Sequence, residues 1–180
     1  MKLKFLALLL LFIANISFAQ DNNSGIIYGE NHAYSLTAPK GWVLDNESGV
    51  DQGIHAVFYP VGSSWANGTT VMYANFATYV KGQNNVDELI SYDTSKFREQ
   101  SPDLKIVLQK DIALKDGKIA KVLSFSNDKD DNTEAVAYIP GATGTVLIII
   151  TSRDKDEYEK YYPKFEELIK SYFWIADKFK

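Results

Sequence analysis

Apolar residues follow patterns that predict most strands of the fold. Residues 146–150 are five consecutive Val, Leu and Ile. A strand that is apolar at every position must be covered on both faces, so residues 144–152 are predicted to form a central strand. Other segments alternate apolar and polar residues, or are rich in β-branched and aromatic residues, as strands are. These further predicted strands are residues 33–38, 54–59, 69–80, 104–114, 118–125 and 133–139.

A first helix is predicted to begin after Asn85. Asn85 is a favourable N-cap residue, and Glu88 stands three residues later, where it completes a capping box. Apolar residues then recur at the helical period. The helix should end at Ser101, because Pro102 follows and the residue before a proline is disfavoured in the helical conformation.

The last helix has the clearest signal, a wide apolar stripe from Tyr158 to Tyr172 at spacings of three and four residues. Pro163 lies inside this stripe. A proline in a helix interior costs about 3 kcal/mol, whereas at the first helical position it costs little. We therefore expect a short turn near residues 156–160 and a main helix that begins near Pro163.

The order of these elements predicts an α+β fold. Asp116-Gly117 between two apolar segments predicts a hairpin, because glycine adopts the positive φ of a type I′ turn. The short connections favour a six- to seven-stranded, mostly antiparallel sheet flanked by two main helices, an α-β-α sandwich. We expect one domain at residues 33–176 and a flexible leader at residues 20–32.

Three segments resemble a known family of folds. They are residues 34–42 (a strand leading into Pro39-Lys40-Gly41-Trp42), the Asp116-Gly117 hairpin after the first helix, and residues 169–173 at the end of the last helix. This arrangement, over residues 33–175, resembles the fold shared by the PsbP extrinsic proteins of photosystem II, the Ran-binding nuclear import factor and DcrB-type bacterial envelope proteins. The resemblance implies an α-β-α sandwich around an antiparallel sheet. It implies no activity, and no functional residue is carried over.

The N-terminal segment has the pattern of a secretory signal peptide. Lys2 and Lys4 precede an apolar segment at residues 5–13, and Ala19 supplies a small residue for cleavage. That segment is too short to span ~30 Å of hydrocarbon, which takes about 20 helical residues. We therefore expect an exported protein, periplasmic or secreted, that is cleaved after Ala19 and begins at Gln20.

Composition narrows the classes of partner. The chain has 180 residues with 19 basic and 23 acidic side chains, a formal charge of −4. Removal of residues 1–19 takes away two lysines, leaving 17 basic and 23 acidic residues and a charge of −6. This balance argues against nucleic acid and anionic membranes as partners, and no membrane insertion is expected after cleavage. The chain has no cysteine, which excludes disulfides, thiol nucleophiles and cysteine-ligated metals.

The sequence lacks the motifs of common catalytic and metal sites. The two histidines, His32 and His55, lie too far apart in the chain for a zinc-binding motif, so neither is expected to bind a metal. No Gly-x-Ser-x-Gly, Gly-x-Gly-x-x-Gly or Walker sequence is present, and no cofactor is expected. We therefore expect a protein that is not an enzyme.

Residues 128–132 contain Asp-x-Asp-x-Asn, the opening of a calcium-binding loop. Such a loop also needs glycine at its sixth position and glutamate at its twelfth, and Thr133 and Ile139 stand there instead. A solvated turn between strands is the favoured interpretation. A looser calcium site near Asp128 and Asp130, built from oxygen ligands, stays open.

Trp65 is the strongest candidate for a binding residue. It lies in a Gly/Ser/Asn-rich loop at residues 62–68, where a large aromatic side chain either folds back as an anchor or meets a partner. Tyr59 and His55 lie just upstream and complete the candidate site. The predicted function is that of an exported, soluble, non-enzymatic protein that binds a small ligand or takes part in envelope assembly with an unknown envelope protein. The alternative is a periplasmic hydrolase or metal-dependent enzyme with a non-standard site.

Overall fold

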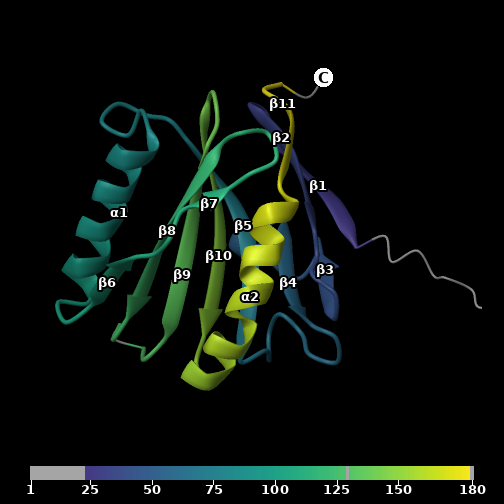
Figure 1. Cartoon of the computed structure of the whole chain (residues 1–180), viewed down its shortest axis with the longest axis vertical. Coiled ribbons are helices and arrows are strands. Elements are labelled where there is room, and N and C mark those ends of the chain that lie inside the picture. Colours follow the sequence, from purple (N-terminus) through teal and green to yellow (C-terminus); the bar gives the residue numbers. More distant parts are fainter. Residues whose placement is uncertain (1–22, 129, 179–180) are drawn as a thin grey trace, which may run out of the picture.

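The computed structural model describes residues 23–128 and 130–178 of the chain (Figure 1). The predicted signal peptide and its cleavage position lie outside these residues. The described chain also contains a short 3-10 helix at Val50–Gln52. The strands and α-helices are β1 (Ser24–Gly29), β2 (His32–Thr37), β3 (Trp42–Asp45), β4 (Ala56–Pro60), β5 (Thr70–Thr78), α1 (Val86–Gln100), β6 (Lys105–Leu108), β7 (Ile112–Ala113), β8 (Ile119–Ser126), β9 (Thr133–Pro140), β10 (Gly144–Ser152), α2 (Lys155–Ser171) and β11 (Phe173–Ala176).

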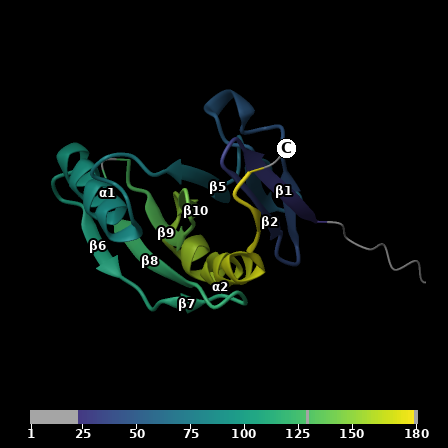
Figure 2. The same ribbon diagram turned by 90° about the horizontal axis from the view of Figure 1, so that it is seen from above.

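The main sheet has eight strands and is antiparallel throughout. Its order is β3-β4-β5-β10-β9-β8-β6, and β7 pairs with β8 beside this path. β10 lies in the middle of the sheet, as its uninterrupted apolar run predicts. The two helices cover opposite faces of the sheet, so the α+β sandwich is confirmed (Figures 1 and 2). No helix in the described residues is long and apolar enough to cross a membrane.

Side chains of β10 alternate between two separate hydrophobic cores. Val146, Ile148 and Ile150 pack into the core beneath α2. Leu147 and Ile149 pack into the smaller core beneath α1. Successive side chains of a strand point to opposite faces, and a helix covers each face of β10. Every one of these five residues therefore faces a helix and has to be apolar. The continuous apolar run therefore follows from the position of β10 between two helices.

The predicted flexible leader at residues 20–32 is wrong where the structure describes it. Residues 24–29 form β1, which pairs with β2 in a small three-stranded sheet of order β1-β2-β11. Ile27 of β1 is buried in the core beneath α2, and Asn23 donates a hydrogen bond to the carbonyl of Trp42. A strand of six residues with one buried side chain gives little periodic signal, which is why the sequence pattern did not predict it.

The predicted break of the last helix at Pro163 is also wrong. α2 continues without interruption from Lys155 to Ser171. Pro163 removes the N–H that would bond to the carbonyl of Glu159, but both residues are exposed and water can satisfy that carbonyl. Tyr158 and Phe165, on either side of the proline, are both buried against the sheet. Their burial outweighs the cost of the proline and holds the two parts of the helix in line.

The predicted strand at residues 104–114 is divided into β6 and β7, and both pair with β8. Leu108 pairs with Leu123 and Ile112 with Ala120, so residues 109–111 oppose only residues 121–122. This extra residue is a bulge, which bends the edge of the sheet toward α2 (Figure 2). The hairpin predicted after β7 is confirmed, with Gly117 at φ +82°.

A substitution of Pro163 tests the balance between the proline and the flanking core contacts. Pro163→Ala restores a helical N–H donor, and alanine has the best helix propensity, so the free energy of unfolding should rise by about 1–3 kcal/mol. Urea denaturation of the purified protein measures this change. Lys164→Ala, at the next position, is the control and should change the same quantity by about 0.5 kcal/mol or less. An unchanged or lower stability for Pro163→Ala would show that the proline imposes no cost.

Candidate functional site

Three recesses surround the β8–β9 turn at one end of the main sheet. The helix cavity lies between α2 and β8, with a volume of about 610 Å³. The acidic recess, beside the end of α1, measures about 180 Å³, and the Trp65 recess measures about 460 Å³. Each two of these recesses share a lining residue. Phe125 lines the helix cavity and the acidic recess, Asn132 lines the acidic recess and the Trp65 recess, and Arg153 lines the helix cavity and the Trp65 recess. The three recesses are therefore neighbours around this turn, and the first two lie on opposite faces of the sheet.

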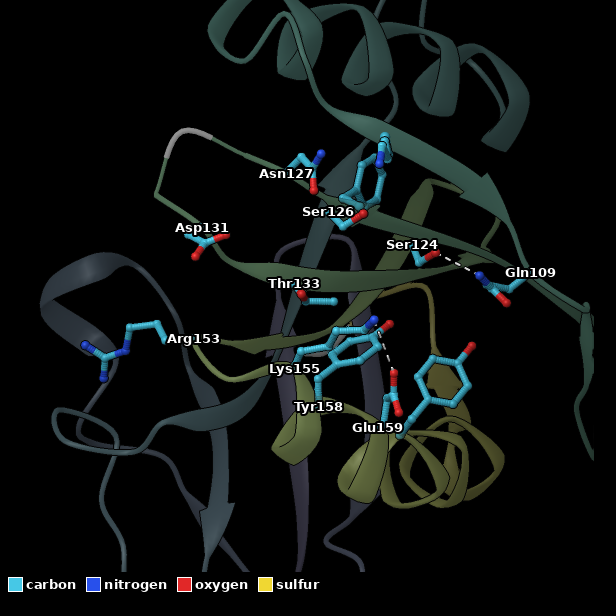
Figure 3. A pocket seen from close by; sticks show the side chains of 13 residues that line it. Gln109, Ser124, Ser126, Asn127, Asp131, Thr133, Arg153, Lys155, Tyr158 and Glu159 are labelled. Carbon is cyan, nitrogen blue, oxygen red and sulfur yellow. Dashed lines mark hydrogen bonds and ion pairs between the residues drawn. The ribbon is translucent and has the colours of Figure 1, made fainter.

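The helix cavity has a floor of hydroxyl groups and a wall of tyrosines (Figure 3). Its floor consists of Ser124 and Ser126 of β8 and Thr133 of β9, and its wall is formed by Tyr158 and Tyr162 of α2. Earlier residues on the same face of β8 are apolar and belong to the core beneath α2. The change from apolar to hydroxyl side chains along one face of β8 marks the point where the core ends and the cavity begins.

The bulge between β6 and β7 closes the far side of the helix cavity. Gln109, the first residue after β6, donates a hydrogen bond from Nε2 to Ser124 Oγ at 2.7 Å (Figure 3). Its own N–H donates to the carbonyl of Val122 at 2.8 Å. Both bonds fix the bent strand edge against β8, so this side of the cavity is held in place by the backbone as well as by a side chain.

Charged side chains of both signs stand at the rim of the helix cavity. The basic residues are Lys105, Arg153 and Lys155, and the acidic residues are Asp131 and Glu159. Arg153 donates from Nη2 to the carbonyl of Gly68 at 3.0 Å and is therefore directed to the Trp65 loop. Lys155 and Glu159 form a loose ion pair at 3.8 Å, with side chains 78% and 65% exposed. Such an exposed pair contributes little, so Lys155 remains available to a ligand.

The two tyrosines of the wall remain uncharged at neutral pH. Their ring centroids lie 5.7 Å apart at an interplanar angle of 53°. Burial is the main cause that raises the pKa of Tyr158, and it also raises the pKa of Tyr162, with Glu166 adding to the second shift. Each ring therefore offers an apolar surface and a neutral hydroxyl group.

Trp65 is half-buried and packs edge-to-face against Tyr73, with ring centroids 5.8 Å apart. Tyr73 itself belongs to the edge of the core beneath α1, and burial strongly raises its pKa. Tyr73 therefore belongs to the core rather than to a binding surface. Trp65 combines both sequence interpretations, because its loop is anchored by this ring contact and it still lines the Trp65 recess.

Tyr59 and His55 do not join Trp65 in one site. The Tyr59 hydroxyl donates to Asp45 Oδ2 at 2.8 Å, and this carboxylate also accepts bonds from Ser48, whose hydroxyl and N–H hold the pKa of Asp45 well below its usual range. His55 is exposed. Among the described residues, no hydrogen bond or ring contact links Trp65 to Tyr59 or His55. Tyr59 instead stabilises the turn after β3.

The Asp-x-Asp-x-Asn sequence builds the β8–β9 turn. Asp128 Oδ1 accepts the N–H of Asp130 at 3.0 Å and the N–H of Asn132 at 2.7 Å. An aspartate that bonds to the backbone in this way stabilises the turn itself. No group of three or more His, Cys, Asp and Glu side chains is arranged to hold a metal ion among the residues that the structure describes.

Glu134 lines the acidic recess and has the most unusual carboxyl group of this region. Burial raises its pKa to about 7, and the neighbouring charge of Asp128 adds to this shift. Phe97 and Phe125 pack edge-to-face in the same recess, with centroids 5.2 Å apart. A carboxyl group that titrates near neutral pH can donate or accept a proton under ordinary conditions.

The helix cavity is not predicted by any pattern in the sequence. Its residues come from β6, β8, β9 and α2, which are far apart in the chain and meet only in the folded sheet. One signal was present in the sequence: Ser124 and Ser126 continue the face of β8 that Ala120 and Val122 begin. Polar residues at positions that should face a helix indicate a break in the core.

Comparisons with known proteins show the fold. No family model matches the chain, and no curated protein sequence matches it. Cyanobacterial PsbP (CyanoP) from Synechocystis sp. PCC 6803 is similar in structure, with a TM-score of 0.53, 12% identity, and coverage of 91% of this chain and 99% of that chain. A mutant of the protein Mog1 is similar with a TM-score of 0.51 and 12% identity, covering 86% of this chain and 97% of that one. The chain therefore has a Mog1/PsbP-like fold, in agreement with the resemblance found in its sequence.

The raised pKa of Glu134 predicts how stability depends on pH. The carboxyl group ionises near its ordinary value of 4.5 in the unfolded chain and near 7 in the folded protein. The unfolded state therefore loses its proton first, and the free energy of unfolding should fall as pH rises from about 4.5 to about 7. Glu134→Gln, which carries no titrating group, should lack this part of the decline.

Urea denaturation at several pH values measures the difference between wild type and Glu134→Gln. Other groups also make the free energy of unfolding depend on pH, such as His32, because burial lowers the pKa of this residue. Their contributions cancel when the two proteins are compared. Glu30→Gln, at an exposed position, is the control and should follow the wild-type curve. Parallel curves for wild type and Glu134→Gln would contradict the assigned pKa.

Proposed function

We propose that this protein is an exported, non-enzymatic binding protein and that its ligand or partner group enters the helix cavity. The observation that carries the proposal is the set of side chains that line this cavity. Ser124, Ser126 and Thr133 place hydroxyl groups where apolar residues would extend the core, and tyrosine rings face them. Hydroxyl groups at these positions stabilise the core less than apolar side chains would. Their presence is explained if they form hydrogen bonds with a ligand that enters the cavity.

The size and chemistry of the helix cavity support binding. A volume of about 610 Å³ lies within the range of about 300–1,000 Å³ that is usual for small-molecule sites. Ligand sites in general combine apolar or aromatic walls with a few fixed polar groups that orient the ligand. The tyrosine wall and the hydroxyl floor have this combination, and the Gln109–Ser124 hydrogen bond fixes one side of it.

The lining residues favour binding over catalysis. Neither histidine nor cysteine is among the 13 described residues that line the helix cavity. The pKa values of Tyr158 and Tyr162 are raised, so both hydroxyl groups stay protonated at neutral pH and neither supplies a phenolate base. The two acidic residues, Asp131 and Glu159, are exposed.

A second candidate function, that of a hydrolase or metal-dependent enzyme, is favoured by Glu134. This residue has a pKa of about 7 and lines the acidic recess with Asp128 and Asp130. A screen of hydrolase substrates against wild type and Glu134→Gln separates the two functions. Reproducible turnover that Glu134→Gln abolishes would favour the enzyme, and its absence would favour the binding protein.

The export part of the proposal rests on the N-terminal sequence pattern. In a bacterial host, the protein should be found outside the cytoplasm with Gln20 as its first residue, because Ala19 completes a cleavage site. Cell fractionation and N-terminal sequencing measure both properties. Ala19→Lys is the matched variant and should keep the signal segment, since it places a large charged residue at the cleavage position. A cytoplasmic wild-type protein that retains Met1 would contradict export.

A variant that fills the helix cavity tests the location of the site. Ser126→Tyr places a large ring on the cavity floor and should abolish binding of any ligand found for the wild type, while strands accommodate tyrosine well. A thermal-shift screen of neutral and acidic saccharides, amino acids, dipeptides and phosphorylated compounds identifies the ligand. Ile119→Tyr, at an exposed position of the same strand outside the cavity, is the control. Ligand binding that persists in Ser126→Tyr would place the site elsewhere.

A further inference from the structure

We infer that the helix cavity binds a small acidic saccharide, with the sugar ring on the tyrosine wall, its hydroxyl groups on the floor and its acid group at Lys105 and Lys155. The inference rests on the proposed function and adds the chemical class of the ligand. Three observations carry it: the character of the tyrosine wall, the hydroxyl groups of the floor, and the unequal charges of the rim.

The wall of the helix cavity suits a saturated ring that carries polar groups. The apolar face of a sugar ring packs on an aromatic ring through its C–H groups, and a tyrosine adds a polar hydroxyl at its edge. Tyr158 is buried, whereas Tyr162 is half-buried and therefore presents more of its ring to the cavity. Tyr162 is the principal contact that we assign to the sugar ring.

The floor of the helix cavity suits a ligand with several hydroxyl groups. Each serine or threonine hydroxyl can both donate and accept a hydrogen bond, as a sugar hydroxyl can. Ser126 and Thr133 form none of the side-chain hydrogen bonds found in the described residues, so both hydroxyl groups are available. Ser124 accepts a bond from Gln109 and can still donate its own proton. These three groups lie on neighbouring strands and face the same space (Figure 3).

The rim of the helix cavity favours an acid group. It carries three basic residues and two acidic ones, in a chain that has 19 basic and 23 acidic residues. Lys105 forms no ion pair with any described residue, and Lys155 is held only by its loose contact with Glu159. An anionic ligand would gain the attraction of both amino groups without breaking a strong pair. The cavity is thus a locally basic site on an acidic protein.

Isothermal titration calorimetry of the purified protein with digalacturonic acid tests this inference. The dimethyl ester of the same disaccharide keeps the rings and all their hydroxyl groups but has no charge, and inorganic phosphate supplies an anion without a ring. Digalacturonic acid should bind, the ester should bind about tenfold more weakly, and phosphate should bind more weakly still. Added salt should weaken binding of the acid more than binding of the ester, because salt screens only the charged contact.

Four variants separate the contacts. Lys105→Gln should weaken binding of the acid about three- to tenfold and leave binding of the ester unchanged. Lys110→Gln makes the same change of charge on the same sheet edge, outside the cavity, and is the matched control. Tyr162→Ala should abolish binding of both disaccharides, and Tyr162→Phe, which keeps the ring and the fold, should retain most of it.

Each other outcome contradicts a different part of the account. Equal affinity for acid and ester would overturn the acid group, and equal affinity for digalacturonic acid and phosphate would overturn the sugar ring. Binding of another chemical class instead, abolished by Ser126→Tyr, would overturn the saccharide and leave the proposed binding function standing. Failure of every compound in the screen to bind would contradict the proposed function itself.

Discussion

The burial of β10 between two helices determines how the other elements of this fold are arranged. Its residues supply apolar contacts to α2 on one face and to α1 on the other, so no position of the central run can be polar. β5 and β9 pair with β10 along its length, and the sheet extends outward from these three strands. The helices are placed by this strand, and the space left beyond α2 forms the helix cavity.

The cavity between α2 and β8 lies where the apolar face of the sheet ends. Along β8, Ala120 and Val122 pack beneath α2, whereas Ser124 and Ser126 face an open space. The bulge after β6 bends the sheet edge around this space, and the β8–β9 turn, fixed by Asp128, closes its end. Strands and a helix hold the floor and the tyrosine wall of this recess, and the connections after β6 and β8 complete its sides. Rigid elements position polar groups better than loops do.

Much of the fold is predictable from the sequence because its strongest signals are local. The apolar run of β10, the N-cap at Asn85 and the Gly117 turn each act within a few residues, and each is confirmed. β1 is not predictable in this way, because it depends on pairing with β2 and on a core formed by distant segments. The continuity of α2 through Pro163 likewise depends on tertiary burial that outweighs local propensity. The helix cavity is not predictable from local patterns, because four elements must converge to form it. Trp65 could be named as a candidate binding residue because the composition of its loop is a local signal.

Amide chemical-shift mapping by NMR can locate the binding site that we propose, where the apolar face beneath α2 gives way to hydroxyl groups. Titration of the isotope-labelled protein with digalacturonic acid should shift the amides of residues 124–126, 133 and 155–162, which line or adjoin the cavity. The amides of β1, β2 and β11, in the small sheet, should stay in place. Shifts centred on the small sheet or on the acidic recess beside α1, with residues 124–126 unchanged, would contradict the account.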